Sequence, residues 1–323
     1  MRKFLLALLL LLVLAGSGAA WWGWQAWQQP GPLPEATAIV VERGSGTQAL
    51  AQALGERGVI RDPRIFAGAV WVTRNQGPLR AGEYLFPAHA SLRQVLEVLR
   101  TARPVQRMVT LPEGLTARQM VDILENVPGL FGDMPAIDEG ELLPETYAYS
   151  WGDSRATVVR RASGAMRETL NRLWKEHAAD LPLKTPREAL ILASIVERET
   201  GKPEERARVA AVFINRLKRN MPLQSDPTVA YAAADGGALD RPLTRADLDM
   251  DHPFNTYRNR GLPPGPIASP GIASLRAVLQ PMETDELYFV ADGSGGHAFA
   301  RTLEEHNRNV ARWRALERQR NAP

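Results

Sequence analysis

Two glutamates end a long apolar run in the segment ILASIVERET, residues 191–200. Glu197 and Glu199 follow this run directly, and the run itself is typical of a buried helix. On a helix, side chains two positions apart point about 200° away from each other, so these two cannot face one cleft. We therefore predict that they are not a paired-carboxylate site: one acid acts chemically, and the other has a structural task.

The position of these acids favours a general acid. Both lie in the last helical turn, where the helix dipole disfavours negative charge, and apolar surroundings raise the pKa of a carboxyl group. A carboxylic acid that stays protonated near neutral pH can donate a proton in catalysis. The alternative is that both acids are exposed and form ion pairs with Arg198, Lys202 or Arg206.

Two polar loops follow this helix and indicate a sugar-binding groove. The segment LQSDPT (223–228) offers an amide, a hydroxyl and a carboxylate, and the segment NTYRNRGLPPGP (255–266) adds amides, an aromatic ring and stiffening prolines. Planar amides, carboxylates and aromatic faces are the groups from which sugar sites are built. The alternative is two ordinary surface turns, with Asp226-Pro227 as a helix start.

Composition excludes several other functions. The chain has 323 residues, a formal net charge of +3 and no cysteine, which excludes thiolate nucleophiles, disulfide scaffolds and cysteine-ligated metals. No basic run accompanies an aromatic platform, so we expect no nucleic-acid partner. None of the five histidines has metal-ligand spacing to another, so His252, His297 and His306 are interpreted as structural or rim residues. We expect neither a metal nor an organic cofactor.

The amino terminus predicts a membrane anchor. Residues 4–24 are uncharged and long enough to cross ~30 Å of hydrocarbon, Arg2 and Lys3 precede them, and four tryptophans follow between positions 21 and 27. A cleavable signal peptide with a small-residue site at Gly18-Ala19-Ala20 is the alternative. We expect a tip and anchor over residues 1–27. A flexible Pro/Gly spacer over 28–36, with a reach of ~15–18 Å, would follow.

Beyond the spacer, the periodicity predicts an α+β body. We expect helices near 47–57 and 60–73, a strand at 82–86, a helix after the cap Ser91, a strand near 105–114 and a helix capped by Thr116. The spacing then predicts helices over 155–179, 186–200 and 203–219, a hairpin on either side of Gly293–Gly296, and a polar helix from Leu303.

Several segments together resemble the MltG, or YceG-like, family of endolytic murein transglycosylases. They are EGELLPETY (139–147), ASIVERET (193–200), VFINRLKRNMPLQSDPTVAY (212–231), NTYRNRGLPPGPIASPG (255–271) and LYFVADGSGGHAFARTLEEHN (287–307). The resemblance covers roughly residues 40–310. It implies a small LysM-like α/β subdomain at 37–104 and a larger mixed α+β YceG-like catalytic domain at 105–323.

The resemblance also implies roles for individual residues. Glu197, the first glutamate of the A-S-I-V-E-x-E-T motif, is expected to be the catalytic acid. The residues expected to line the groove are Gln224, Ser225, Asp226, Asn255 and Tyr257. Two departures from the family pattern stand out: Glu145 replaces a usual aspartate, and Ala268-Ser269 stands where an asparagine commonly precedes Pro-Gly.

The implied reaction is cleavage of the β-1,4 bond between N-acetylmuramic acid and N-acetylglucosamine within nascent glycan strands, with 1,6-anhydro ends as products. Such an enzyme would be a lytic transglycosylase that terminates glycan elongation. It would be single-pass in the cell inner membrane with its catalytic body in the periplasm, beside cell-wall synthases (penicillin-binding proteins). The alternatives are a non-catalytic peptidoglycan-binding scaffold and a true hydrolase.

The anchor interpretation yields a first prediction. We expect the mature protein to retain Trp21 and to stay with membranes through a high-salt wash, because an apolar span is not released by screening charge. Amino-terminal sequencing of the membrane fraction is the measurement. A mature terminus close to Ala20 would instead establish a cleaved signal peptide.

Overall fold

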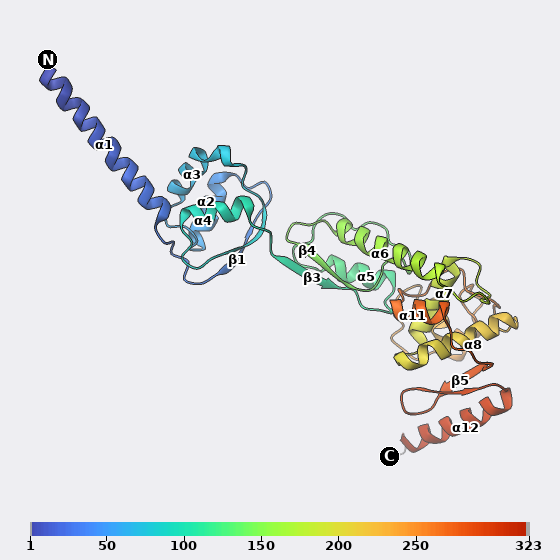
Figure 1. The fold of residues 1–323 in the computed structure, drawn as a ribbon. Coiled ribbons are helices and arrows are strands. Elements are labelled where there is room, and N and C mark those ends of the chain that lie inside the picture. Colours follow the sequence, from blue (N-terminus) through green and yellow to red (C-terminus); the bar gives the residue numbers. More distant parts are fainter. Residues whose placement is uncertain (1, 321–323) are drawn as a thin grey trace. The chain divides into compact units, whose positions relative to one another are not determined.

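The structure is a computed structural model and describes residues 2–320. Its elements, in chain order, are α1 (Arg2–Gln28), β1 (Thr37–Val41), α2 (Thr47–Glu56), α3 (Pro63–Val72), η1 (Arg74–Gln76), β2 (Gly82–Phe86), α4 (Leu92–Thr101), β3 (Gln106–Thr110), α5 (Ala117–Glu125), β4 (Thr146–Ser150), α6 (Arg155–Lys175), α7 (Pro186–Glu199), η2 (Pro203–Glu205), α8 (Arg206–Lys218), α9 (Asp226–Ala233), α10 (Arg245–Asp249), α11 (Ile272–Leu279), β5 (Tyr288–Ala291), β6 (His297–Ala300) and α12 (Leu303–Arg320). Figure 1 shows a mixed α+β chain, which confirms that part of the prediction.

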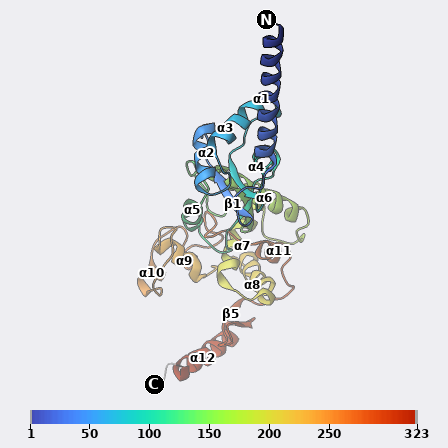
Figure 2. The same cartoon turned by 90° about the vertical axis from the view of Figure 1, so that its left-hand side faces the viewer.

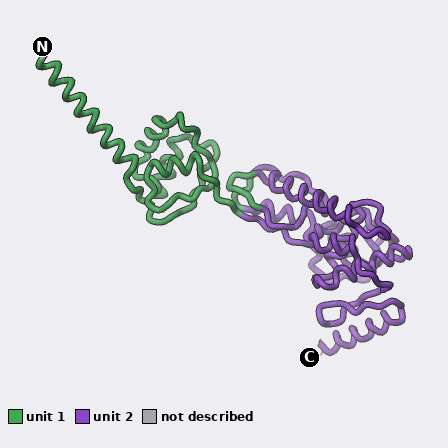
Figure 3. The backbone as a smooth tube through the Cα atoms, in the orientation of Figure 1, with its two compact units in different colours: residues 1–107, 128–131, 148–153 green, residues 108–127, 132–147, 154–323 purple. Residues whose placement is uncertain are grey.

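The strands of residues 2–320 pair into three two-stranded sheets, β1–β2, β3–β4 and β5–β6. The chain divides into two compact units (Figure 3). Unit 1 takes the residues up to 107 with two short segments, 128–131 and 148–153, and unit 2 takes the remainder. The predicted domain boundary after residue 104 and the LysM-like character of residues 37–104 stay predictions.

In unit 1 a small antiparallel sheet and the helices α2, α3 and α4 surround one core. The register of the sheet runs from Thr37 opposite Phe86 to Val41 opposite Gly82. Apolar side chains of β1, β2, α2, α3 and α4 meet in the core. Its fully enclosed members include Leu54, Phe66, Phe86, Val95 and Leu99. As predicted, Ser91 caps α4, in a capping box with Gln94.

Residues 28–36 do not form the flexible spacer that the sequence predicts. Leu33 is only 4 % exposed and belongs to the core of unit 1. The backbone N–H of Gly31 donates to the carbonyl of His89 at 3.0 Å, and the N–H of His89 donates to the carbonyl of Leu33 at 2.8 Å. That prediction is wrong, because a buried side chain and two backbone hydrogen bonds fix the end of α1 to the rest of unit 1.

Unit 2 is built around α7, whose middle is enclosed on all sides. Residues 189–196 are all buried, and they pack with α6, α8 and α11 in one core. Full burial of each large aliphatic side chain stabilises such a core by about 1.5–3 kcal/mol. The near-continuous apolar run of the sequence is therefore the central helix of this unit.

Sequence signals set both ends of α7. Thr185 accepts a hydrogen bond from the backbone N–H of Glu188 at 3.2 Å, and Pro186 is the first helical residue. At the other end Thr200 is extended, with φ −138° and ψ 130°. The helix therefore ends on Glu199, so that both candidate acids lie in its last turn.

Ser194 joins α7 to the proline-rich loop before α11. Its side chain is fully buried. Its hydroxyl donates to the carbonyl of Ile191 at 2.7 Å and accepts from the backbone N–H of Ile267 at 3.0 Å. The next turn of this loop is also fixed, because the N–H of Ser269 donates to the carbonyl of Leu115 at 2.9 Å. The loop therefore takes one path across unit 2.

These contacts predict the effect of removing one hydroxyl. Ser194→Ala leaves the buried N–H of Ile267 without its acceptor, which costs roughly 1–3 kcal/mol of unfolding free energy. Ser163→Ala on α6, at a half-buried position, is the matched control and should cost nothing, since alanine favours helix. Urea denaturation of the two variants tests this. Equal stabilities would show that the hydrogen bond does not hold the loop.

Candidate functional site

A cavity of about 390 Å³ lies at the carboxyl end of α7. Glu199 lines this cavity, whereas Glu197 does not. The other lining residues come from α8, from the two polar loops and from the β5–β6 and α12 segment. They are Arg216, Leu223, Gln224, Asp226, Tyr257, Phe289, Val290, Ala291, His297, His306 and Val310.

Glu199 is a partly buried acid held by a hydroxyl. The Oγ of Ser225 donates to Glu199 Oε1 at 2.5 Å. The pKa of Glu199 is raised to about 7, chiefly by burial and also by the nearby charge of Asp226, while the Ser225 hydrogen bond and the charge of Arg216 oppose the rise. The carboxyl group is therefore still partly protonated at neutral pH, as a general acid must be.

The two polar loops lie side by side, joined by Thr256. The backbone N–H of Gln224 donates to the carbonyl of Thr256 at 3.1 Å, and the N–H of Ser225 donates to the hydroxyl of Thr256 at 3.0 Å. That hydroxyl also contacts the hydroxyl of Thr228 at 2.9 Å. Ser225, Thr228 and Thr256 are each at most 2 % exposed. This buried network of hydroxyl groups sets the position of the Ser225 hydroxyl beside Glu199.

Gln224 adopts a left-handed backbone, with φ 51°, a conformation that is costly for a residue with a side chain. Arg216 of α8 helps to hold it there. Arg216 is 7 % exposed and donates to the carbonyl of Leu223 at 2.8 Å, to Gln224 Oε1 at 3.3 Å and to the carbonyl of Leu287 at 2.7 Å. This one buried cation therefore ties the LQSDPT loop to the chain that leads into β5.

Asp226 and Tyr257 form a pair at the cavity. The hydroxyl of Tyr257 donates to Asp226 Oδ1 at 2.6 Å. Burial raises the pKa of Tyr257, and the hydrogen bond to Asp226 adds to the effect. The tyrosine therefore remains a neutral donor, and it fixes the carboxylate of Asp226 at the wall of the cavity.

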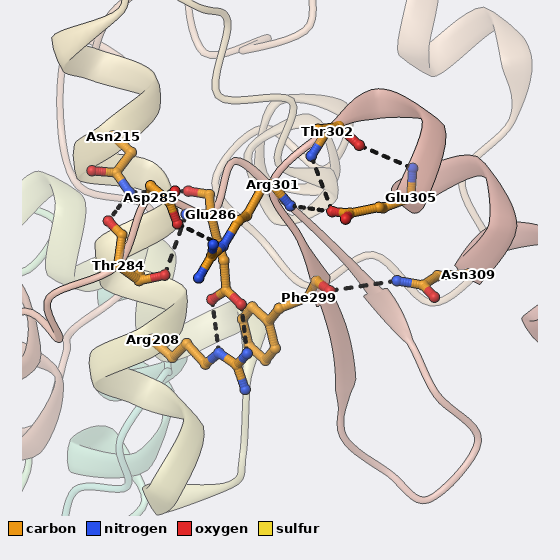
Figure 4. A network of polar contacts seen from close by, with 10 residues as sticks. All are labelled: Arg208, Asn215, Thr284, Asp285, Glu286, Phe299, Arg301, Thr302, Glu305 and Asn309. Carbon is orange, nitrogen blue, oxygen red and sulfur yellow. Dashed lines mark hydrogen bonds and ion pairs between the residues drawn. The ribbon is translucent and has the colours of Figure 1, made fainter.

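The far wall of the cavity is the β5–β6 hairpin with α12, and a polar network attaches the chain before it to α8 (Figure 4). Arg208 donates two hydrogen bonds to the carboxylate of Glu286, at 2.8 and 2.5 Å. The Asn215 side chain donates to the carbonyls of Thr284 at 2.7 Å and Glu286 at 3.0 Å. A bidentate arginine–carboxylate contact fixes direction as well as distance, so this wall has a defined place relative to α8.

His297 is a cavity residue held from behind by a carboxylate. Its Nδ1 lies 2.8 Å from Glu205 Oε2, and its backbone N–H donates to Glu205 Oε1 at 3.0 Å. Burial alone would raise the pKa of Glu205, but the hydrogen bonds from His297 hold it below its usual range. Because an ionised carboxylate only accepts, His297 Nδ1 carries the proton of this contact.

Glu197 has a different environment, on the opposite face of α7. Its side chain is 5 % exposed, and its Oε1 lies 3.4 Å from Arg206 Nη2. Its Oε2 accepts the backbone N–H of Gly271 at 2.9 Å, at the start of α11. Glu197 therefore ties α7 to α11, and it forms the Arg206 ion pair that the alternative interpretation anticipates.

The structure brings four of the six predicted site residues to Glu199 and leaves two elsewhere. Gln224, Asp226 and Tyr257 line the cavity, and Ser225 supports it from behind. Glu197 lies on the opposite side of α7, and Asn255 is fully buried. The Asn255 amide donates to the carbonyls of Leu248 and Met250 at 2.9 and 2.8 Å, so it holds a turn and has no donor left for a ligand.

Sequence reasoning did not single out Arg216 or Glu205, left the task of Glu199 open, and placed His297 and His306 only as structural or rim residues. No local sequence motif marks Arg216 or Glu205, because their partners lie far away in the sequence. Arg216 contacts Leu287, 71 residues on, and Glu205 contacts His297, 92 residues on. The helical spacing separated the two acids correctly but could not say which face of α7 meets the polar loops. Among residues 2–320 no group of three histidine, aspartate or glutamate side chains is arranged to hold a metal ion.

Comparisons place the chain among known proteins. The model of the YceG-like family matches residues 39–312, and the chain therefore belongs to this family. It is 41 % identical over 170 residues, 53 % of its length, to the endolytic murein transglycosylase of Bacillus subtilis strain 168, of which it covers 46 %. It is 30 % identical over 322 residues to the endolytic murein transglycosylase of Streptococcus pneumoniae R6, with 84 % of this chain and 57 % of that protein covered.

A solved structure supports the fold. The crystal structure of a YceG-like protein from Listeria monocytogenes aligns with 85 % of this chain and 98 % of its own, at 28 % identity and a TM-score of 0.52. The chain spans about half the length of the curated relatives it matches.

The raised pKa of Glu199 predicts how stability depends on pH. The folded state holds this proton up to about pH 7, whereas an unperturbed glutamate releases it near 4.5. The unfolding free energy should therefore fall as pH rises through this window. In the Glu199→Gln variant, which has no carboxyl group to titrate, the decrease should be smaller by roughly 2–3 kcal/mol. Urea denaturation at pH 4.5 and pH 8 measures it for both proteins. An identical fall in the variant would show that Glu199 titrates normally.

Proposed function

We propose that this protein is an endolytic peptidoglycan lytic transglycosylase with Glu199 as its catalytic acid. Its family membership and the names of the two relatives described above, from Bacillus subtilis and Streptococcus pneumoniae, support the reaction class. The observation that carries the assignment of the acid is the cavity at the end of α7. There a carboxyl group with a pKa of about 7 meets Gln224, Asp226 and Tyr257.

The proposed chemistry begins with proton donation. Protonated Glu199 donates to the glycosidic oxygen between N-acetylmuramic acid and N-acetylglucosamine as that bond breaks and positive charge develops at the anomeric carbon. The Ser225 hydrogen bond to Oε1 leaves Oε2 for the leaving oxygen. A raised pKa suits this task, since the proton is present at neutral pH yet easily released.

Closure of the sugar ring completes the reaction without water. The 6-hydroxyl of the muramic sugar attacks its own anomeric carbon, and its proton passes to Glu199, which is now ionised, so a 1,6-anhydro end forms. A glycosidase ordinarily needs a second carboxylate as nucleophile or base, but here the substrate supplies the nucleophile. Gln224, Tyr257 and His297 would hold hydroxyl and amide groups of the sugars.

One observation favours a second candidate reaction. Asp226 is a second carboxylate at the same cavity, close enough to Glu199 to raise its pKa. An acid with a nearby base is the arrangement of an inverting hydrolase, in which Asp226 would activate a water. The product separates the two, since hydrolysis gives a reducing end and transglycosylation an anhydro end.

We further propose where the reaction takes place. Helix α1 is long and apolar enough to cross a membrane between Lys3 and Gln28, and the packed segment that follows leaves little freedom between anchor and unit 1. With the body in the periplasm, the enzyme would meet nascent glycan strands beside the synthases that make them, and each cut would end elongation. The alternative remains a non-catalytic scaffold of that machinery.

Matched substitutions on α7 test the assignment. Glu199→Gln should lower the cleavage rate of purified murein by roughly 10²–10⁴-fold, the usual contribution of a general acid. Glu197→Gln, the same chemical change two positions away, should retain most of the activity but lower stability, because its ion pair with Arg206 is lost. Mass spectrometry of the products measures rate and product type together.

Each of the other outcomes would support a different interpretation of this protein. The reverse pattern would restore Glu197 as the acid that the family resemblance implies. Reducing ends in place of anhydro ends would establish the hydrolase, and Asp226→Asn should then abolish activity as well. If the folded wild type cleaves nothing and both variants function in cells, the scaffold alternative is correct.

A further inference from the structure

Helix α3 has an exposed apolar face that no other part of unit 1 covers. Phe66 points into the core and is fully buried, whereas Trp71 and Val72 are 67 % and 70 % exposed. Arg64 and Gly68 are also exposed, and these positions lie on one side of the helix. An exposed tryptophan beside an exposed valine at a helix end is suited to contact an apolar partner.

The first turn of α3 lies next to the apolar amino-terminal helix. Ile65 of α3 and Trp22 and Gln25 of α1 line one cavity of about 180 Å³, together with Leu92. In both Figure 1 and Figure 2, α3 lies beside the carboxyl-terminal part of α1. Since residues 28–36 are packed against the core, α3 is held at the level where α1 would leave a membrane.

The charge around this face matches a phospholipid surface. Between residues 61 and 76 stand three arginines, Arg61, Arg64 and Arg74, against a single acid, Asp62. The carboxylate of Asp62 is occupied at the helix start, where it accepts the N–H of Arg64 at 2.7 Å. The guanidinium of Arg74 lies over the Trp71 ring, 4.6 Å from its centre. Tryptophan with flanking arginines is the composition of interfacial helices.

We propose that α3 is a second membrane contact, lying in the plane of the bilayer surface beside the anchor. Trp71 and Val72 enter the interface between headgroups and acyl chains, and Arg64 and Arg74 bind lipid phosphates. The contact fixes how unit 1 is oriented on the membrane, which a single spanning helix alone does not do, because such a helix can rotate about its own axis. This surface is independent of the cavity at Glu199.

The absence of cysteine from the chain makes a direct test possible in the full-length protein. The variant Val72→Cys carries an environment-sensitive fluorophore, and the protein is reconstituted into vesicles of phosphatidylcholine and phosphatidylglycerol with brominated acyl chains as quenchers. Leu85→Cys on β2, 56 % exposed in the same unit, is the matched control. Bromine quenching at position 72 should exceed that at position 85 by about twofold or more, as for a group at the acyl boundary.

The lipid headgroup supplies a second readout. Replacing Arg64 and Arg74 with glutamine, or omitting phosphatidylglycerol, should reduce quenching at position 72 and leave position 85 unchanged. Equal quenching at the two positions would overturn the proposal. So would disulfide-linked dimers of the unlabelled Val72→Cys variant, since these would show that a second copy of the chain covers this face.

Discussion

A carboxyl group at the carboxyl end of a buried helix is the constraint on which this structure depends. The last turn of α7 presents unpaired carbonyl groups, so negative charge there is disfavoured, and the packed core behind it supplies little solvation. Glu199 meets this constraint by keeping its proton up to about pH 7 and by accepting a single short hydrogen bond from Ser225. Burial of the helix thus raises the pKa of Glu199, and the two polar loops and the β5–β6 hairpin form a cavity beside it.

The two glutamates of α7 meet the same constraint in different ways. Glu197 is neutralised, with Arg206 on one oxygen and the N–H of Gly271 at the start of α11 on the other. That arrangement links the last turn of α7 to Arg206 and to the start of α11. Of the two acids at the end of α7, Glu197 therefore contacts the neighbouring helix, and Glu199 has its pKa raised by burial.

Two surfaces of this chain differ in their chemistry. The cavity in unit 2 presents amide, carboxylate, phenol and imidazole groups, which suit a polar glycan. In unit 1 the outer face of α3 presents Trp71 and Val72 with arginines, which suit a lipid surface. The packed connection at residues 28–36 fastens α1 to the rest of unit 1, so membrane attachment would determine orientation as well as location.

The sequence by itself determined the mixed α+β character and most helix positions, because caps such as Thr185 and Ser91 and the apolar spacing act locally. It also determined that Glu197 and Glu199 must point apart, since helical geometry requires this. Tertiary structure alone decided which acid meets the polar loops. It also decided that the Asn255 amide holds a turn, and that Arg216 and His297 line the cavity with Glu205 behind His297. It also decided that residues 28–36 are packed. Each of these depends on contacts between segments tens of residues apart, and local spacing carries no information about them.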